Sequence, residues 1–334
     1  MLAPKFWYPE NNEKSFSSLA LIPFGHIYSL LSKLRMSKAV KKQFDIPIVC
    51  IGNLNAGGTG KTPTTISAAE FLRDRKYNVH IVSRGYGGNA MGPLSVNDKE
   101  HSADDVGDEA LMLSAFAPTW VATKRSDGIQ SAIKEGADII LLDDGFQDPS
   151  VYKDLSILTV NAKKGFGNNR CIPAGPLREK LSNGLERADV LISIGTETSQ
   201  RTFKSTYKSY INMPLGIANL EVLNTGLSLE NMKVLAFAGI AHPENFFDTL
   251  RAQGAEIVDY QALADHQKLS STIMKRLIVD ARAENAQLIT TEKDYMRLPK
   301  EFRSEVMTLP VRIKLNETLS WEKIFKPILS CQGK

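Results

Sequence analysis

The stretch that decides the fold is Ile46-Pro47-Ile48-Val49-Cys50-Ile51, an apolar run that leads into Asn55-Ala56-Gly57-Gly58-Thr59-Gly60-Lys61-Thr62. The apolar run predicts a buried strand, and residues 63–73 have the pattern of a helix. A glycine-rich turn between a strand and a helix N-terminus lets backbone N–H groups converge on phosphate oxygens. In such a loop Lys61 reaches the β- and γ-phosphates, and the Thr62 hydroxyl binds Mg²⁺. Residues 55–62 are therefore expected to bind a nucleoside triphosphate.

The loop departs from the usual pattern G-x-x-x-x-G-K-[ST] at its first position, where Asn55 replaces glycine. Asparagine tolerates left-handed backbone conformations better than most residues, so we expect the turn to form. The alternative interpretation is a glycine-rich hairpin beside a chance Lys-Thr pair. The strand before the loop and the helix after it favour the phosphate loop.

Size and composition describe an ordinary globular protein. The chain is 43% hydrophobic and 23% charged, as is usual for a globular protein. Its 334 residues are enough for two domains. A net charge of +4 is too small to indicate a nucleic-acid partner, and no obligate protein partner is evident. The cysteines at positions 50, 171 and 331 fit neither a disulfide framework nor a zinc site, which favours a reducing cytosol.

Short apolar segments alternate with helical patterns over the first two thirds of the chain. We expect strands at residues 46–51, 79–83, 120–122, 139–142, 157–160 and 190–194. We expect helices at residues 63–73, 107–116, 125–134 and 177–187. This alternation predicts an α/β fold of the P-loop NTPase type, with a mostly parallel sheet and helices on both faces.

The pattern changes near residues 207–229, where residues 207–211 and 216–220 read as short extended pieces. A second series then begins, with strands expected at residues 232–238, 256–260 and 287–290 and helices at 243–253 and 270–284. We therefore expect an N-terminal helical segment (1–44), a P-loop core (45–207), a linker (208–231) and a smaller α/β domain (232–334). Two domains on a hinge can close over substrates.

Carboxylates at three positions are candidates for chemistry. Asp143 and Asp144 end an apolar strand, which is how P-loop enzymes bring an acid to Mg²⁺, although acids also commonly end strands in turns. Asp108 opens a predicted helix, where an acid usually caps the helix or complements its dipole. The functional alternative makes Asp108 the base that accepts a hydroxyl proton.

Two arginines are further candidates. Arg84 and Arg125 follow predicted strands and either stabilise phosphate charge or form surface ion pairs.

The N-terminal segment has an unusual distribution of apolar and basic residues. Residues 19–31 are mostly apolar, but they are too few to span a bilayer. A basic cluster follows, consisting of Lys33, Arg35, Lys38, Lys41 and Lys42. An apolar face beside a basic cluster is typical of a chain that lies on an anionic membrane. The alternative is a packed first helix with a solvated basic end.

Several motifs in order resemble the tetraacyldisaccharide 4′-kinase family, the lipid A 4′-kinases of Gram-negative bacteria. The resemblance runs from about Trp7 to about Phe325. Its markers are the phosphate loop, Ser83-Arg84-Gly85-Tyr86-Gly87, Gly107-Asp108-Glu109, Asp143-Asp144-Gly145-Phe146-Gln147, Pro173-Ala174-Gly175-Pro176-Leu177-Arg178-Glu179, Phe237-Ala238-Gly239-Ile240, Asp265-His266 and Thr291-Glu292-Lys293-Asp294.

The resemblance implies a kinase that uses ATP and Mg²⁺ to phosphorylate the 4′-hydroxyl of a tetraacylated disaccharide 1-phosphate. It also implies peripheral contact with the cytoplasmic face of the inner membrane. By similarity, Asp108 is the base and His266 approaches from the second domain. Arg125, Gln147, Asp143 and Asp144 are assigned to the nucleotide and metal site in the same way. The sequence departs from the family pattern at Asp148, Gln267 and Ala241-His242-Pro243.

Two other functions fit parts of the sequence. A P-loop ATPase or GTPase switch, such as a metallochaperone-like NTPase, would have a similar loop. It would not need the amphipathic N-terminus, and we would expect a metal-binding Cys/His motif or a guanine-recognition motif. A soluble small-molecule kinase with a packed first helix is the other alternative.

Overall fold

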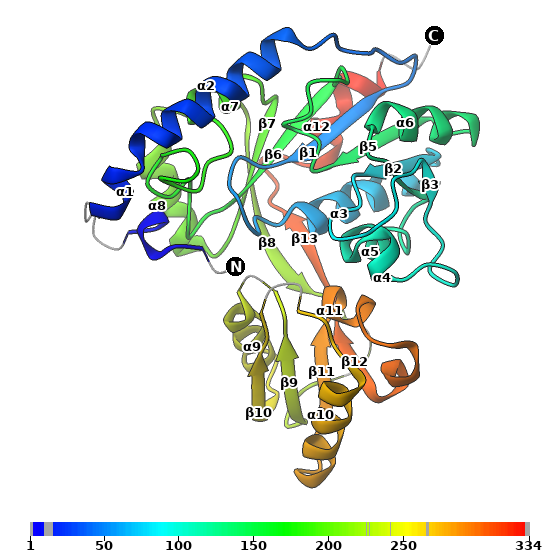
Figure 1. The fold of residues 1–334 in the computed structure, drawn as a ribbon. Coiled ribbons are helices and arrows are strands. Elements are labelled where there is room, and N and C mark those ends of the chain that lie inside the picture. Colours follow the sequence, from blue (N-terminus) through cyan, green and yellow to red (C-terminus); the bar gives the residue numbers. More distant parts are fainter. Residues whose placement is uncertain are drawn as a thin grey trace.

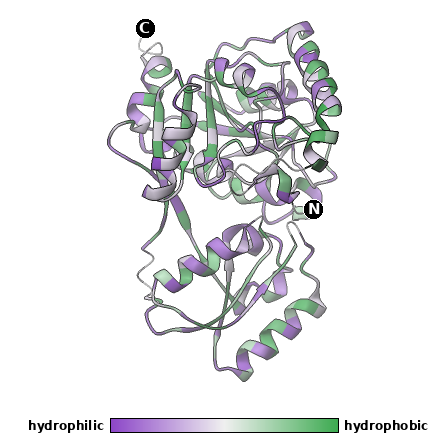
Figure 2. Cartoon of the chain, turned by 90° about the vertical axis from the view of Figure 1, so that its left-hand side faces the viewer, coloured by the Kyte–Doolittle hydropathy of each residue, from purple (hydrophilic) through white to green (hydrophobic). Residues whose placement is uncertain are grey.

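The computed structural model describes residues 3–9, 16–224, 226, 228–240, 242–264 and 267–330. Over these residues the chain forms two α/β units, and the smaller lies beyond one end of the larger (Figure 1 and Figure 2). The chain passes between the units twice. It leaves the larger unit after β8 (Leu215–Val222) for β9 (Lys233–Ala238) and returns from β12 (Val306–Leu309) to β13 (Val311–Leu315).

The larger sheet has nine strands in the described part of the chain, in the order β13-β8-β7-β6-β1-β5-β2-β4-β3. The edge strands β13 and β3 pair antiparallel with their neighbours, and the other pairs are parallel. The remaining strands are β1 (Ile48–Gly52), β2 (Val79–Ser83), β3 (Leu94–Ser95), β4 (Thr119–Val121), β5 (Ile139–Asp143), β6 (Leu155–Asn161) and β7 (Val190–Ile194). The expected fold class is confirmed, because short strands buried on both faces form a mostly parallel sheet.

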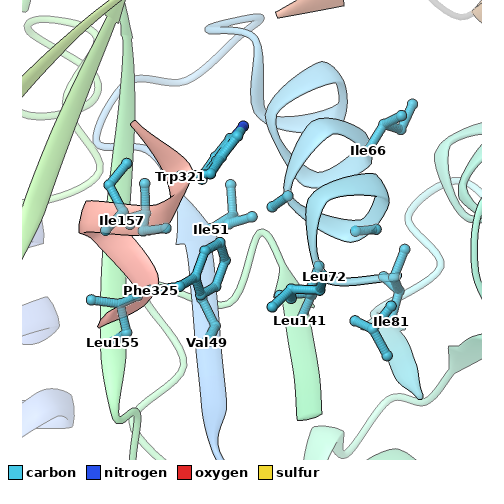
Figure 3. Close-up of a cluster of buried hydrophobic side chains, with 14 of the residues drawn as sticks. Val49, Ile51, Ile66, Leu72, Ile81, Leu141, Leu155, Ile157, Trp321 and Phe325 are labelled. Carbon is cyan, nitrogen blue, oxygen red and sulfur yellow. The ribbon is translucent and has the colours of Figure 1, made fainter. Parts of the chain in front are cut away.

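Helices cover both faces of this sheet, because consecutive side chains of each strand point to opposite sides. On β1, Val49 and Ile51 contribute to one core, and Ile48 and Cys50 to the other. The first core is covered by α3 (Lys61–Asp74), α5 (Asp108–Leu113) and α12 (Trp321–Leu329). The second is covered by α6 (Arg125–Lys134), α7 (Leu181–Glu186) and α8 (Glu197–Tyr207). Figure 3 shows Trp321 of α12 in the first core, together with side chains of β1 and α3.

The smaller sheet has four parallel strands in the described residues, in the order β10-β9-β11-β12. Its other strands are β10 (Glu256–Ala262) and β11 (Gln287–Thr291). Helix α9 (Pro243–Ala252) covers one face, and α10 (Ser271–Ala283) covers the other with the 3-10 helix η3 (Lys300–Glu305). The short helix α11 (Glu292–Met296) follows β11 and packs against α5 of the larger unit.

Two of the expected domain limits differ from the structure. Residues 208–231 were expected as a linker, but they include β8, which pairs with β7 and β13 in the larger sheet. Residues 232–334 were expected as one domain, but β13 and α12 return to the larger unit, where α12 packs in the same core as α3. Residues 207–211 were expected to be extended, but Tyr207 ends α8 and packs its ring edge-on against Phe166. These assignments depend on packing between distant segments, which local pattern does not record.

The N-terminal segment forms η1 (Lys5–Trp7), α1 (Phe16–Ala20) and α2 (Ile22–Lys38). It packs on the loop 165–176 of the larger unit. The Trp7 indole donates a hydrogen bond to the Pro173 carbonyl (3.0 Å), and the Ser18 hydroxyl donates to the Ala174 carbonyl (2.8 Å). Among the described residues, no helix has the length and apolar character needed to cross a bilayer.

Candidate functional site

The predicted phosphate loop connects β1 to α3 and has an open glycine edge. Gly57 and Gly60 adopt positive φ angles of 116° and 88°, a region that favours glycine. Gly57 and Gly58 are exposed, whereas Thr59 is buried. The Thr59 hydroxyl accepts a hydrogen bond from the Asn53 side chain (2.9 Å), which stabilises the turn on its buried side. The backbone at the glycines is therefore accessible to phosphate oxygens, and α3 begins directly at Lys61.

Asn55 has a different role from the one expected. Its φ is not positive, so its tolerance of left-handed conformations is not used. Its buried side-chain amide donates to the Gly165 carbonyl (3.0 Å) and to the Tyr8 hydroxyl (3.3 Å). The neighbouring Ala56 N–H donates to the Pro176 carbonyl (2.7 Å). Asparagine at this position therefore fastens the phosphate loop to the loop 165–179 and to the N-terminal segment.

Asp143 lies at the end of β5, next to the strand that leads into the phosphate loop. Its carboxylate accepts a hydrogen bond from the Thr65 hydroxyl of α3 (3.2 Å). Burial, followed by the negative charges of Glu109 and Asp144, raises the pKa of Asp143 to about 7. A carboxylate with these surroundings gains most from a cation bound beside it.

Asp144 has a left-handed backbone, with φ 51°, directly after β5. This conformation directs its side chain to Arg178, whose guanidinium donates to both carboxylate oxygens (2.9 and 3.0 Å). The Lys61 ammonium lies 3.9 Å away. Burial opposes ionisation, but the charges of Lys61 and Arg178 hold the pKa of Asp144 below its usual value. Asp144 therefore connects the phosphate-loop lysine to the loop 165–179.

The oxygen atoms at this end of the sheet fit Mg²⁺. The expected ligands were the Thr62 hydroxyl and the carboxylates of Asp143 and Asp144, and Mg²⁺ binds through one or two carboxylates together with substrate phosphates. Among the described residues, no group of three His, Cys, Asp or Glu side chains converges as an all-protein metal site. The raised pKa of Asp143 is relieved by a bound cation, so the donor set suits a metal that arrives with a nucleotide.

Arg125 is buried at the start of α6, and its side chain has protein partners. It donates to Asp148 (3.0 Å) and to the backbone carbonyl of Asp144 (2.8 Å). Asp148, one of the positions that departs from the family pattern, is thus the counter-ion of Arg125. Arg84, the other candidate for phosphate charge, is exposed after β2. Arg125 therefore stabilises the turn after β5 through these hydrogen bonds.

Gln147 also lies behind the phosphate loop. Its amide donates to the Asn53 carbonyl (2.9 Å) and to Glu179 (3.1 Å). Glu179 is buried and paired with Arg187. The loop 165–179 thereby supplies Arg178 and Glu179 to the site. Both residues belong to a segment that was quoted as a family marker, but the sequence assigned no role to either side chain.

Asp108 lies where the two units meet. One carboxylate oxygen accepts the N–H of Glu109 (2.9 Å), which fits its place in the first turn of α5. The other lies 3.9 Å from the Lys293 ammonium and 3.8 Å from Arg297 Nε, both from the smaller unit. Asp108 therefore faces cations as well as its own helix. Neither Lys293 nor Arg297 was assigned a role from the sequence, although Lys293 lies in the family marker at residues 291–294.

Three further positions named from the sequence lie in the smaller unit. His266 and its neighbour Asp265 lie outside the described residues. Gln267, which departs from the family pattern, accepts a hydrogen bond from the Ala264 N–H (2.9 Å) through its side chain. The third departure, His242, caps the start of α9, and its carbonyl accepts the Asn245 N–H (3.2 Å).

Comparisons with known proteins agree with this geometry. The family model described as LpxK, tetraacyldisaccharide-1-P 4′-kinase, matches residues 17–329. The chain belongs to the tetraacyldisaccharide 4′-kinase family. It is 50% identical to the tetraacyldisaccharide 4′-kinase of Jannaschia sp. (strain CCS1) over 95% of this chain and 96% of that protein. It is 46% identical to that of Dinoroseobacter shibae over 94% of each.

A solved structure of this family shares the fold. LpxK from Aquifex aeolicus, solved in complex with ATP, is 25% identical, has a TM-score of 0.77, and covers 94% of this chain and 99% of that chain. The resemblance expected from the ordered motifs is confirmed. Family membership excludes the metallochaperone-like alternative for this chain.

Proposed function

We propose that this tetraacyldisaccharide 4′-kinase transfers the γ-phosphoryl group of ATP to the 4′-hydroxyl of a tetraacyldisaccharide 1-phosphate. The product is lipid IVA, an intermediate of lipid A. The observation that carries the proposal is the pairing of an open phosphate loop with Asp108 at the junction of the two units, in a chain that matches the family over residues 17–329.

The nucleotide side of the site follows from the loop. The N–H groups of residues 57–60 bind the β-phosphate, and Lys61 turns from Asp144 to the γ-phosphate when ATP enters. Thr62, Asp143 and Asp144 would hold Mg²⁺, which would neutralise charge on the phosphates. Gln147 and Asn55 keep the loop in place through their contacts with neighbouring loops.

The acceptor side requires a base. Asp108 takes the proton of the sugar hydroxyl as the oxygen–phosphorus bond forms and the bond to ADP breaks. Arg125 supports the turn that carries Asp143 and Asp144. We assign His266 to the approach of the smaller unit, as the family resemblance implies. Closure of the units excludes water, which otherwise competes as the acceptor.

We also propose that α1 and α2 bind a membrane surface, because many of their large apolar side chains are exposed instead of packed against the protein. Within residues 16–38 the two buried residues are small, Ser18 and Gly25, and the half-buried ones are Leu21, Ile22, Ser29, Ser32 and Met36. The large apolar side chains turned outward are between 40% and 83% exposed, and they are Phe16, Leu19, Phe24, Ile27, Leu30, Leu31 and Leu34. An unpartnered apolar face of this kind suits a lipid surface.

The basic cluster adds to this surface. Lys33, Arg35, Lys38, Lys41 and Lys42 are all exposed. Each contributes about 1 kcal/mol at an anionic membrane, and insertion of the apolar side chains supplies the rest. The chain is thereby a peripheral protein of the cytoplasmic face of the inner membrane, where its lipid substrate lies.

One experiment tests the activity. Purified protein is incubated with γ-labelled ATP, Mg²⁺ and the lipid disaccharide monophosphate in detergent, and we expect label in the lipid. A reaction without labelled lipid rejects the kinase assignment. The D108A variant should lose turnover, and near-normal turnover would remove Asp108 from the role of base.

A second experiment tests the membrane proposal. We expect the L30S/L31S variant to float less with anionic vesicles than the unmodified protein. Val279→Ser is the matched control, because Val279 is as exposed (63%) as Leu31 (62%) but lies on α10 of the smaller unit. Equal flotation of all three proteins would contradict docking through α2.

A further inference from the structure

Helix α11 of the smaller unit and Arg297, the residue that follows it, present two cations to two acids of the larger unit. Lys293 lies 3.2 Å from Glu109 and 3.9 Å from Asp108. Arg297 Nε lies 3.8 Å from the same oxygen of Asp108. Asp108 and Arg297 are nearly fully buried, at 4% and 8% exposure. A buried carboxylate at a junction between units depends strongly on such partners.

The two cations are held differently. Arg297 is fixed within the smaller unit, because it donates to the carbonyls of Gly239 (2.9 Å) and Gln267 (3.3 Å) and pairs with the buried Asp294. Lys293 is 20% exposed, and its ammonium reaches both acids of α5. Lys293 is thus a residue of α11 that makes its ion pairs across the junction.

Lys293 offsets negative charge on both acids of α5, because its ammonium pairs with Glu109 and also faces Asp108.

The same short helix is linked to the phosphate-binding helix. Glu292, next to Lys293, pairs with Arg312 of β13 (3.0 Å), and Arg312 pairs with Glu70 of α3 (3.2 Å). α11 is thus connected to α3, which begins at Lys61, and to α5, which begins at Asp108. A displacement of the smaller unit would move Lys293 away from both acids at once.

We propose that Lys293 is a positioning residue for the phosphoryl transfer: it holds Asp108 and Glu109 in the arrangement needed for the acceptor hydroxyl, and only the smaller unit can supply it. This inference rests on the proposed function. The proton of the sugar hydroxyl goes to Asp108. ATP binding should be little affected, because the phosphate loop makes its contacts within the larger unit.

The test compares kcat and KM for ATP in the label-transfer assay. We expect Lys293→Met to lower kcat by about 100-fold, the cost of misplacing a reacting group by about 1 Å. The KM for ATP should stay within about twofold, because nucleotide contacts are intact. Lys293→Arg should recover most of the lost rate, because it restores a cation that reaches both acids. If the Met variant fails to fold, Lys293→Gln replaces it with the same expectation.

Lys268→Met is the matched control. Lys268 also crosses between the units, to Asp104 (2.5 Å), but both side chains are exposed. We expect its kcat to remain within about twofold of the unmodified enzyme, as for other exposed ion pairs. A merely structural role for these contacts would lower both methionine variants alike and would leave Lys293→Arg no better than Lys293→Met.

Three outcomes overturn the inference, and they can be told apart. If the unmodified protein labels no lipid, the proposed function fails and the inference fails with it. If D108N is as fast as the unmodified protein, Asp108 is not the base, and the positioning role of Lys293 is wrong as well. If D108N is slow and Lys293→Met keeps its kcat within about twofold, the kinase assignment and the base stand and this inference alone is wrong.

Discussion

Gly107 offers a direct test of how Asp108 is placed. Its backbone has φ 85° and ψ 145°, close to a region that only glycine occupies readily. A Cβ at this position would lie 2.5 Å from the Tyr86 carbonyl oxygen. That carbonyl cannot easily move, because Asn89 and Ala90 of the same loop donate to the carbonyls of Asp104 and Asp105 (3.0 and 2.8 Å). Gly107→Ala should therefore displace α5 and the Asp108 side chain.

The magnitude has two parts. The backbone conformation costs about 1–3 kcal/mol with a side chain present, and crowding against a fixed carbonyl costs about 1–3 kcal/mol more. Gly87→Ala is the matched control, because Gly87 has the same φ of 85° but no heavy atom lies within 4 Å of the place that its Cβ would take. We expect Gly107→Ala to lower the free energy of unfolding by about 2 kcal/mol more than Gly87→Ala, which is the crowding contribution.

Urea denaturation followed by tryptophan fluorescence measures this difference, because Trp7, Trp120 and Trp321 all lie in the larger unit. The kcat of Gly107→Ala in the label-transfer assay should fall by about 100-fold, since Asp108 would move by about 1 Å. Equal unfolding free energies for the two variants, or an unchanged kcat in Gly107→Ala, would refute the close approach as the cause of Asp108 placement.

Three further predictions concern the network around the phosphate loop. Asp148→Ala leaves the buried Arg125 without its counter-ion, so urea denaturation should show a loss of about 3 kcal/mol; a loss under about 0.5 kcal/mol would contradict a buried ion pair. Asp143 has its pKa raised to about 7 in the folded protein, against about 4 when unfolded. In metal-free protein its contribution to stability is therefore complete below about pH 4 and is lost as the pH rises to about 7, and the same titration on Asp143→Asn should lack this slope. Asn55→Ala removes the hydrogen bonds to Gly165 and Tyr8 and should cost about 1–3 kcal/mol while weakening ATP binding in calorimetry, whereas wild-type values for both would show that these bonds do not hold the loop.

The local elements of the larger unit could be predicted because they depend on short-range pattern. The strand at residues 79–83 and the helix at residues 125–134 have the limits that the sequence predicted. The helix expected from residue 177 begins only at Leu181. The backbone at Leu177 is used in a bridge to Asn55, and the Arg178 N–H donates to the Leu54 carbonyl. That difference arises from a contact between segments more than a hundred residues apart, which local propensity does not describe.

Some residues of the candidate site could likewise be found from the sequence, and others only from the tertiary structure. Glycines, Lys61 and the acids at the end of β5 could be found from the sequence, because a phosphate loop and a strand-terminal carboxylate occupy fixed positions along the chain. Arg178, Lys293 and Arg297 could not be found in this way. They reach Asp144 and Asp108 only because the loop 165–179 and helix α11 fold back against β5 and α5.

The sequence by itself therefore determined the phosphate loop, the alternation that builds a parallel sheet, and the ordered motifs of the kinase family. These features are set by residue type and by spacing along one segment, where backbone geometry and side-chain period act over a few residues. The tertiary structure alone decided that β8, β13 and α12 complete the larger unit, that Asn55 serves as a hydrogen-bonding residue, and that cations of the smaller unit face Asp108. Those results depend on which distant surfaces bury each other, and burial is a property of the whole folded chain.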